Sequence, residues 1–269
     1  MDLTLVGPGR AGLALGLAAR SAGHRIIGVL ARDPDAAAAA ARRLDSVALD
    51  WSQPLPASDL AVIAVRDDAI AAVVALLAGK TGAVGGAVHL SGLAPVGILE
   101  PLAVPVGSLH PLQSMPTPET GAARLAGAWF GVTTEDDLLA DRLYALAASL
   151  GGHPFELADA DKPLYHAAAA AAANFTLAAL SISRRLFAAA GVDFAAAGPL
   201  MEAVMANAIE LGPDGALTGP VARGDAGTVR AQVAAVAAAV PELVDPFVAM
   251  VRATAAVAGT SEIIEGALR

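Results

Sequence analysis

The chain has 269 residues, no cysteine and a net charge of −9 at pH 7, and 56% of its residues are hydrophobic. The lack of cysteine excludes a disulfide framework and cysteine-based metal or nucleophile chemistry, and no metal site is expected. The acidic balance, without a basic cluster, argues against nucleic acid as a partner. Much of the apolar fraction is alanine, and we expect neither a secretory peptide nor a membrane-spanning helix, which would need about 20 strongly apolar residues. A cytoplasmic protein is the simplest expectation.

The first part of the chain alternates apolar runs with helical patterns. The runs "LTLV", "RIIGVL", "VALD", "LAVIAV", "GAVHLSG", "VPVGSLHPL", "AWFGVTT" and "HPFEL" read as strands, and "LALGLAARSAG", "DPDAAAAAARRL", "AIAAVVALLAG" and "EDDLLADRLYALAASLGG" read as helices. The Asp-Pro pair of the second helix suits an N-cap and first helical position. Continuous apolar strands that alternate with helices are typical of a doubly wound parallel sheet. We therefore predict an α/β domain over residues 1–158.

The second part of the chain has only helical periodicity. From Pro163 onward this pattern is interrupted only at "GVDFAAAGP" and "LGPDGALTGPVARGD". The sequence predicts an all-α domain over residues 159–269 that contributes to substrate binding and to dimerisation. Its alanine-rich helices can pack closely, and so apolar a domain would otherwise expose a large patch, so a homodimer is expected.

A glycine-rich turn follows the first apolar run. Gly7, Gly9 and Gly12 in "GPGRAG" form the G-x-G-x-x-G pattern between a predicted strand and a predicted helix. In a Rossmann domain the first glycine permits the tight turn, the second lets the backbone approach a pyrophosphate, and the third allows close helix packing. The helix N-terminus then binds the anion. We expect a dinucleotide here, contacted by Gly7, Pro8, Gly9, Arg10, Ala11 and Gly12; a glycine turn without a ligand is the alternative.

The end of the second predicted strand bears on the choice of cofactor. Arg32 follows Gly12 by 20 residues, where an acidic residue would hold the ribose hydroxyl of NAD. A guanidinium there suits the 2′-phosphate of NADP, and Arg10 adds positive charge nearby. Asp33 leaves NAD open, since it could bind a ribose or cap the next helix. Val65, at the end of another strand, is expected to line the nicotinamide part of the cleft.

Polar side chains follow two further strands. Ser91 in "HLSG" and His110 in "SLHPLQ" are expected at the same sheet edge, where they could bind and protonate a carbonyl substrate. The alternative for His110 is a structural role in tying two loops together, and for His89 the structural interpretation is preferred. Asp67 or Asp68 is expected to cap a helix rather than to act in catalysis.

The helical half offers further candidates. Lys162, His166 and Asn174 are spaced to share one helix face, where they are expected to reach the cleft; a solvated face is the alternative. Arg223 could clamp a substrate carboxylate, and Asp225 is expected to cap the helix that follows it. The residues alone leave open which of His110, Lys162 and His166 donates a proton.

Together these motifs resemble those of a known family. "GPGRAG", "AVIAVRDDAI", "HLSG", "SLHPLQ", "KPLYHAA" and "LTGPVARGD" are similar to Rossmann-like NADP oxidoreductases whose helical C-terminal half is a domain of unknown function. The wider relatives are 6-phosphogluconate dehydrogenase-like enzymes, including ketopantoate reductases, pyrroline-5-carboxylate reductases and prephenate dehydrogenases. Ser91 with His110 resembles the pair that contacts the reacting hydroxyl in prephenate dehydrogenases. Lys162 with Asn174 is similar to the helix-borne pair of ketopantoate reductases, whose C-terminal acidic motif this chain lacks.

The resemblance implies an enzyme, an NADPH-dependent reductase of a small 2-keto acid. Ketopantoate is the first expectation for this carboxylic acid substrate. The alternatives are a dehydrogenase of a prephenate-like acid, an imine reductase of the pyrroline-5-carboxylate type, and a non-catalytic protein that binds NADP as a sensor, which the fold alone does not exclude.

Overall fold

The structure is a computed structural model that describes residues 1–269, and it divides into two compact units, Met1–Ala170 and Ala171–Arg269. The division lies further along the chain than the boundary predicted after residue 158. The reason is that the first turns of helix α6 (Lys162–Ala170) belong to the first unit, where the Lys162 and Tyr165 side chains bond to the strand-end loop at Ala94 and to His110.

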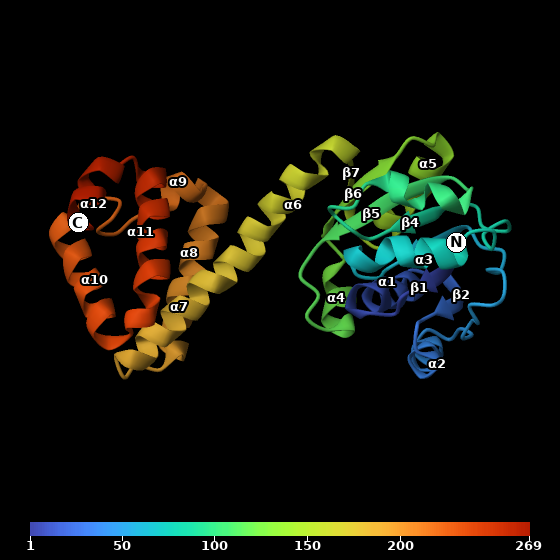
Figure 1. The fold of residues 1–269 in the computed structure, drawn as a ribbon, viewed down its shortest axis with the longest axis horizontal. Coiled ribbons are helices and arrows are strands. Elements are labelled where there is room, and N and C mark those ends of the chain that lie inside the picture. The colour runs from blue at the N-terminus through green and yellow to red at the C-terminus, as the bar shows by residue number, and fades with distance from the viewer. The chain divides into compact units, whose positions relative to one another are not determined.

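The first unit is built on a seven-stranded sheet (Figure 1). The strands are β1 (Asp2–Val6), β2 (Arg25–Leu30), β3 (Leu60–Ile63), β4 (Ala87–His89), β5 (Val106–Leu112), β6 (Trp129–Thr134) and β7 (His153–Glu156), in the order β2-β1-β3-β4-β5-β6-β7. The predicted α/β fold is confirmed. The predicted strand "VALD" is reduced to an isolated bridge between Val29 and Ala48.

One strand pair departs from the predicted parallel arrangement. Strands β5 and β6 are antiparallel, whereas every other neighbouring pair is parallel. The connection between β5 and β6 contains only the short helix α4 (Pro118–Arg124), which packs beside α1 (Arg10–Ser21). A parallel pair needs a crossover to the opposite end of the sheet, and this connection returns from the edge that it left.

Helices cover both faces of the sheet. On one face, Leu13 and Leu15 of α1 and Leu143 of α5 (Asp137–Ser149) join a core with Leu5 and Leu109 of the strands. On the other face pack α3 (Ile70–Leu77) and the 3₁₀ helix η2 (Val96–Leu102). The remaining helical elements of this unit are α2 (Pro34–Arg43), η1 (Asp67–Ala69) and η3 (Asp159–Asp161). Both faces of the sheet are therefore buried, so a ligand would bind at the carboxyl edge of the strands.

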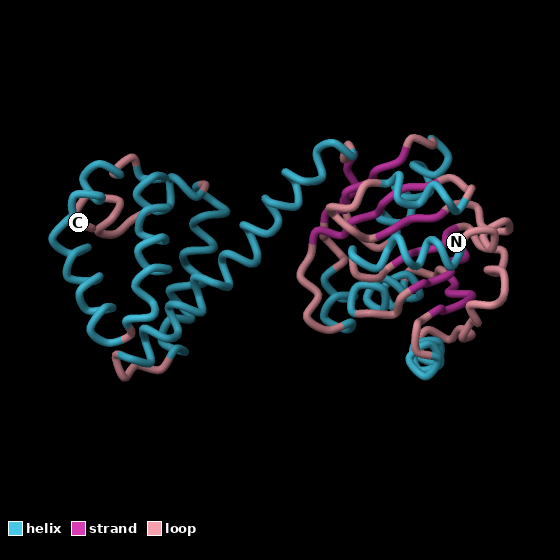
Figure 2. Tube along the Cα trace, in the orientation of Figure 1, coloured by secondary structure: helices cyan, strands magenta, loops and turns pink.

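The second unit is all helical, as predicted (Figure 2). Its elements are the π-helical turn η4 (Ala171–Phe175), α7 (Thr176–Ala189), η5 (Phe194–Ala197), α8 (Gly198–Leu211), α9 (Pro213–Ala216), α10 (Ala226–Ala239), η6 (Pro241–Leu243), α11 (Val244–Ala258) and α12 (Ser261–Ala267). Its core is small and centres on Val229, Val251 and Ile264. Asp225 caps α10 by accepting a hydrogen bond from Thr228 N at 3.0 Å, which confirms the predicted cap.

One continuous helical stretch, Asp159–Ala189, is long and apolar enough to cross a membrane by length and composition alone, with a mean hydropathy of 1.2. Near its start it carries Lys162, which is buried in the first unit, and near its end Arg184 and Arg185. These charged residues, together with the continuity of the stretch with both compact units, favour a helix of a globular protein.

Candidate active site

A glycine turn joins β1 to α1 at the carboxyl edge of the sheet. Gly7 has a φ of +92°, a conformation that side chains rarely adopt, and a Cβ at Gly7 would lie 2.5 Å from Val65 Cγ1. A Cβ at Gly12 would lie 2.4 Å from the Gly7 carbonyl oxygen, so α1 starts in direct contact with the turn. The packing of the protein itself therefore requires glycine at both positions.

Gly9 differs because no protein atom fills the space beside it. The nearest atom to a Cβ at Gly9 would be the Ala64 carbonyl oxygen, 4.0 Å away. Gly9 is the N-cap of α1, no side chain bonds to the free N–H groups there, and the first turn has no acidic residue. Such N–H groups at the positive end of a helix bind anions. The open cradle at Gly9 therefore fits the pyrophosphate of a dinucleotide.

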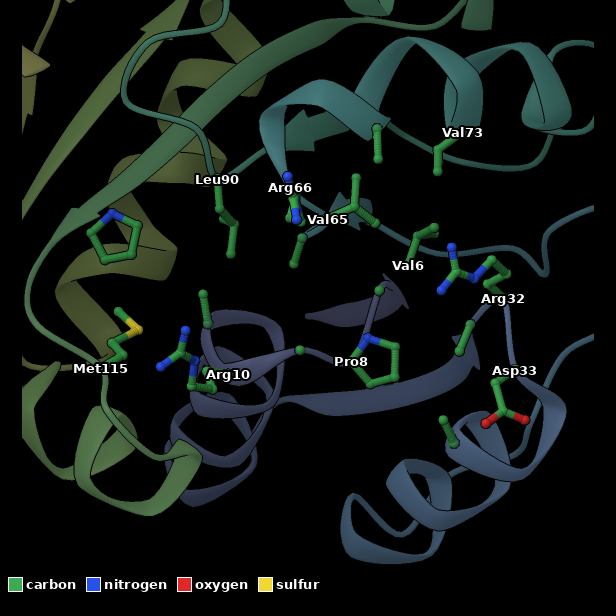
Figure 3. A pocket seen from close by; sticks show the side chains of 18 of the residues that line it. Val6, Pro8, Arg10, Arg32, Asp33, Val65, Arg66, Val73, Leu90 and Met115 are labelled. Atoms are coloured by element: carbon green, nitrogen blue, oxygen red, sulfur yellow. The ribbon is translucent and has the colours of Figure 1, made fainter.

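The glycine turn forms the floor of a cleft of about 1030 Å³ in the first unit. Figure 3 shows Arg32, Asp33 and Val73 at one side of this cleft, Arg10, Leu90 and Met115 at the other, and Pro8 between them. Of the residues predicted to bind the cofactor, Gly7, Pro8, Gly9, Arg10, Ala11, Arg32 and Val65 line the cleft. Gly12 is buried beneath the turn. The cleft has the size of a site for a large cofactor.

Arg32 and Asp33 have different surroundings although both line the cleft. The Asp33 carboxylate accepts a hydrogen bond from Asp35 N at 3.0 Å and caps α2. Of the two roles expected for Asp33, ribose binding and helix capping, the structure shows helix capping. The Arg32 guanidinium is exposed and has neither an ion-pair nor a hydrogen-bond partner. A free guanidinium at this end of the cleft is available to a bound phosphate.

The other two arginines of the cleft also differ. Arg66 is bound to Asp68 through two hydrogen bonds, Nε–Oδ1 at 3.1 Å and Nη2–Oδ2 at 2.7 Å. Arg10 has no ion-pair partner and lies on the side of Leu90 and Met115 (Figure 3). Arg10 is therefore the cation on that side of the cleft that is free to meet an anionic ligand.

Ser91 holds a turn beside the cleft. Its hydroxyl donates to Asp67 Oδ2 at 2.7 Å and accepts from Leu93 N at 3.1 Å and from Ala94 N at 2.9 Å. The expectation that Asp67 caps a helix is wrong, since no side chain caps η1 or α3 and the carboxylate faces Ser91 instead. With its hydroxyl engaged three times, Ser91 shapes the loop; its contact with a substrate stays a prediction.

His110 lies in β5 and lines the cleft. Its Nδ1 lies 2.7 Å from the Tyr165 hydroxyl, and its ring centroid lies 6.5 Å from that of His166. Burial, with a smaller effect from His166, lowers the pKa of His110 to about 4, so the ring is neutral at pH 7. Gly92 lies against the ring: a Cβ there would come within 2.8 Å of His110 Nε2. The structure thus brings His110, His166 and Tyr165 together.

Lys162 is fully buried and does not line the cleft. Its Nζ lies 2.7 Å from Asp159 Oδ1 and donates to the Ala94 carbonyl oxygen at 3.0 Å. Asp159 in turn accepts from Val96 N at 3.0 Å. Burial lowers the pKa of Lys162, and Asp159 opposes this shift. The Lys162 ammonium therefore ties helix α6 to the loop after β4.

Two predicted site residues belong to the second unit. Asn174 lies in the π-helical turn η4 and is exposed, and Arg223 lies in the turn before α10 and is also exposed. Neither has a side-chain hydrogen bond within its own unit. Their contribution to the site stays a prediction.

Sequence reasoning missed two participants of the site, Tyr165 and Asp67. Tyr165 stands three residues after Lys162 and next to His166, on the helix face already considered, and this spacing is a signal that could have selected it. Asp67 has no such local signal, because its partner Ser91 is distant in the sequence and meets it only through the pairing of β3 with β4.

Two family models match successive parts of the chain, and the second begins at residue 128, within the first compact unit. Residues 1–113 match a Rossmann-like domain, and residues 128–254 match a domain of unknown function, DUF2520. Among curated proteins, none matches the chain.

Solved structures share the fold over nearly the whole chain. A Bacteroides fragilis protein proposed to be an NADP oxidoreductase is 22% identical, with a TM-score of 0.82 over 94% of this chain and 97% of its own. The protein TM1727 from Thermotoga maritima is 25% identical, with a TM-score of 0.71 over 94% and 98%. An imine reductase from Streptomyces aurantiacus is 16% identical, with a TM-score of 0.69 over 100% of both chains. The first part of this chain thus matches a Rossmann-like domain and the later part matches DUF2520, and the chain shares its fold with solved structures that include an imine reductase.

Proposed function

We propose that the protein is an NADP(H)-dependent oxidoreductase that reduces a C=O or C=N bond of a small molecule. One observation carries the proposal: a single cleft places an open glycine cradle, the unpaired Arg32 and the neutral His110 around one volume. When bound, the nicotinamide dinucleotide would supply the hydride. The side chains and backbone groups of the cleft would bind the cofactor and orient the substrate.

The cradle and Arg32 account for the cofactor. The free N–H groups of α1 beside Gly9 hold the pyrophosphate, and Arg32 binds a 2′-phosphate. The Asp33 carboxylate is engaged as a helix cap, which weakens the argument for NAD. NADP is therefore the proposed cofactor.

The three candidate proton donors are no longer equivalent. His110 lines the cleft, whereas Lys162 is bound to Asp159 and Ala94, and neither Lys162 nor His166 belongs to the lining. We therefore assign the hydrogen bond to the substrate to His110. Arg10, which lines the same cleft and has no ion-pair partner, is the group we expect to meet a substrate carboxylate.

Imine reduction is the second candidate function. It is favoured by the Streptomyces imine reductase, whose fold matches this chain from end to end. Ketopantoate, the first expectation from the sequence, has no comparable support. Oxidation of a prephenate-like hydroxyl acid would use the same cleft in the reverse direction, and a sensor would bind NADPH without consuming it.

The test is NADPH consumption with cyclic imines, 1-pyrroline-5-carboxylate, ketopantoate and other 2-keto acids. We expect turnover with at least one of them and a loss of about 10² to 10⁴ in turnover for His110→Ala, the usual contribution of a positioned donor. His153→Ala, which removes an exposed histidine of β7, is the matched control and should retain activity. Tight NADPH binding with no consumption across the panel would favour the sensor instead.

A further inference from the structure

Trp51 is a half-buried residue of the cleft that binds the backbone next to Arg32. Its indole Nε1 donates a hydrogen bond to the Ala31 carbonyl oxygen at 2.7 Å. The direction of this bond is unambiguous, because an indole N–H can only donate and a carbonyl oxygen can only accept. The Ala31 carbonyl is part of the peptide bond to Arg32, so the indole holds the backbone at the point where Arg32 begins.

The indole is itself supported by the segment that carries it. Leu49 N donates to the Val29 carbonyl oxygen of β2 at 2.9 Å, which fixes the chain two residues before Trp51. The Trp51 carbonyl oxygen accepts from Lys80 Nζ, and Leu55 N donates to the Lys80 carbonyl oxygen at 2.8 Å. Trp51 also packs against the hydrophobic core on the face of the sheet that α3 covers. Contacts to β2 and to the loop after α3 therefore fix the position of the indole.

The backbone of Arg32 is fixed on both sides, whereas its side chain has no partner. Before it, the Leu30 carbonyl oxygen accepts from Gly7 N of the glycine turn at 2.8 Å. After it, Asp33 is the N-cap of α2. The carbonyl group bonded by Trp51 lies beyond the end of β2 and has the indole as its donor. A guanidinium that starts from an ordered backbone loses less freedom when it binds a ligand.

We propose that Trp51 is a positioning residue that sets the preference for NADPH over NADH, by fixing the backbone from which Arg32 reaches a 2′-phosphate. The inference rests on the proposed function and names a determinant of its cofactor selectivity. Without the indole N–H, the peptide before Arg32 is free to turn, and binding must first order it. Only a ligand that bonds to Arg32 is affected, so NADPH loses affinity and NADH, which has no 2′-phosphate, does not.

Calorimetric titration of NADPH and of NADH into the full-length protein tests this role. Trp51→Phe keeps an aromatic ring in the cleft but removes the N–H donor. We expect it to weaken NADPH binding about 5-fold, equivalent to about 1 kcal/mol for one hydrogen bond, and to leave NADH binding unchanged. Trp129→Phe is the matched control, because it changes the other tryptophan of the chain, which is exposed in β6 and outside the cleft; it should change neither affinity.

A double-mutant cycle separates positioning from direct contact. If Trp51 acts through Arg32, Trp51→Phe should have no effect on NADPH binding in an Arg32→Ala background. An equal effect in both backgrounds would show that the indole contributes independently of Arg32 and would overturn the proposal. So would a loss of affinity that is the same for NADPH and NADH, which a purely structural role of the indole predicts.

The hydrogen bond is also measurable in the wild type, whatever the stability of the variants. In ¹H–¹⁵N NMR with ¹⁵N-labelled tryptophan, the two indole N–H signals are assigned by the loss of one in Trp129→Phe. We expect the Trp51 N–H to exchange with solvent more slowly than that of Trp129, which is 55% exposed. Equally rapid exchange of the two signals would overturn the proposal.

The outcomes distinguish this inference from the proposed function. A wild type that prefers NADPH, with a Trp51→Phe variant that keeps the same preference, would refute the role of Trp51 alone. A wild type without that preference would refute the proposed NADP cofactor as well.

Discussion

Lys162 Nζ lies 2.7 Å from Asp159 Oδ1, and the two side chains differ sharply in exposure, at 1% and 39%. Removing Asp159 leaves a buried ammonium without its counter-charge, whereas removing Lys162 leaves a carboxylate that water can reach. We therefore predict that Asp159→Ala lowers the free energy of unfolding by up to about 3 kcal/mol, the low end of the range for breaking a buried pair. Lys162→Met should cost about 1 kcal/mol, for the hydrogen bond lost by Ala94.

Urea denaturation of both variants measures this difference. Equal losses, or a greater loss for Lys162→Met, would contradict the structural role of the pair. If a substrate is known, Lys162→Met should also keep most of its turnover, since the Lys162 ammonium is outside the cleft.

Two buried histidines make stability depend on pH. Burial lowers the pKa of His89 and of His110 to about 4, from the ordinary histidine value of 6.5. The unfolded chain therefore binds more protons than the folded protein between about pH 6.5 and 4, and stability falls as the pH falls through this window. In the folded protein, the titratable groups that surround His110 are His166, Asp67, Lys162 and Tyr165.

Thermal melts from pH 7.5 to 4.5 should show this loss, and His110→Asn should make the dependence shallower because one of the two groups is removed. A melting temperature that does not change over this range would contradict the neutral state of both rings.

Local motifs were predictable from the sequence because their geometry depends on neighbouring residues. The glycine turn, the Asp33 cap and the Asp225 cap all involve groups within a few residues of one another. The hydrogen bonds between Tyr165 and His110 and between Ser91 and Asp67 were not predictable, because they join elements that meet only when the sheet forms. The same applies to the antiparallel β6, whose direction depends on where α4 packs.

Two of the glycines in the turn should respond in opposite ways to alanine. A Cβ at Gly9 meets only open space, so Gly9→Ala should change stability by less than about 0.5 kcal/mol but obstruct the pyrophosphate. NADPH affinity should fall about tenfold or more, equivalent to at least about 1.4 kcal/mol. Gly12→Ala forces a contact of 2.4 Å with the Gly7 carbonyl oxygen and should cost about 1–3 kcal/mol of stability. Melting curves and NADPH titrations of both variants check this; a Gly9→Ala protein with unchanged affinity would remove the cradle from the cofactor site.

The second unit is proposed to bind a second copy of the chain. Helices α7 and α8 expose large apolar side chains, among them Leu177 at 64%, Leu200 at 62% and Ile209 at 83%, and the core of the unit is small. Apolar surface of this extent is unusual on a monomer. Light scattering should give a dimer at micromolar concentration, and Leu200→Glu with Ile209→Glu should shift it to monomer. Leu138→Glu, at an exposed leucine of α5, is the control that should leave the dimer intact; a monomeric wild type would refute the proposal.

The central claim is that the cleft is an NADP site, and titration of NADPH and of NADH into the wild-type protein tests it most directly. We predict tighter binding of NADPH, because Arg32 has no partner within the protein and can form charge-assisted hydrogen bonds with a 2′-phosphate. Arg32→Ala should weaken NADPH binding by about 10-fold to 100-fold, as the loss of about 1.5–3 kcal/mol implies, and leave NADH binding unchanged. Arg42→Ala, at an exposed arginine of α2 outside the cleft, should change neither affinity. Equal affinities for the two cofactors would contradict the assignment of NADP, and binding of neither would contradict the cleft as a dinucleotide site.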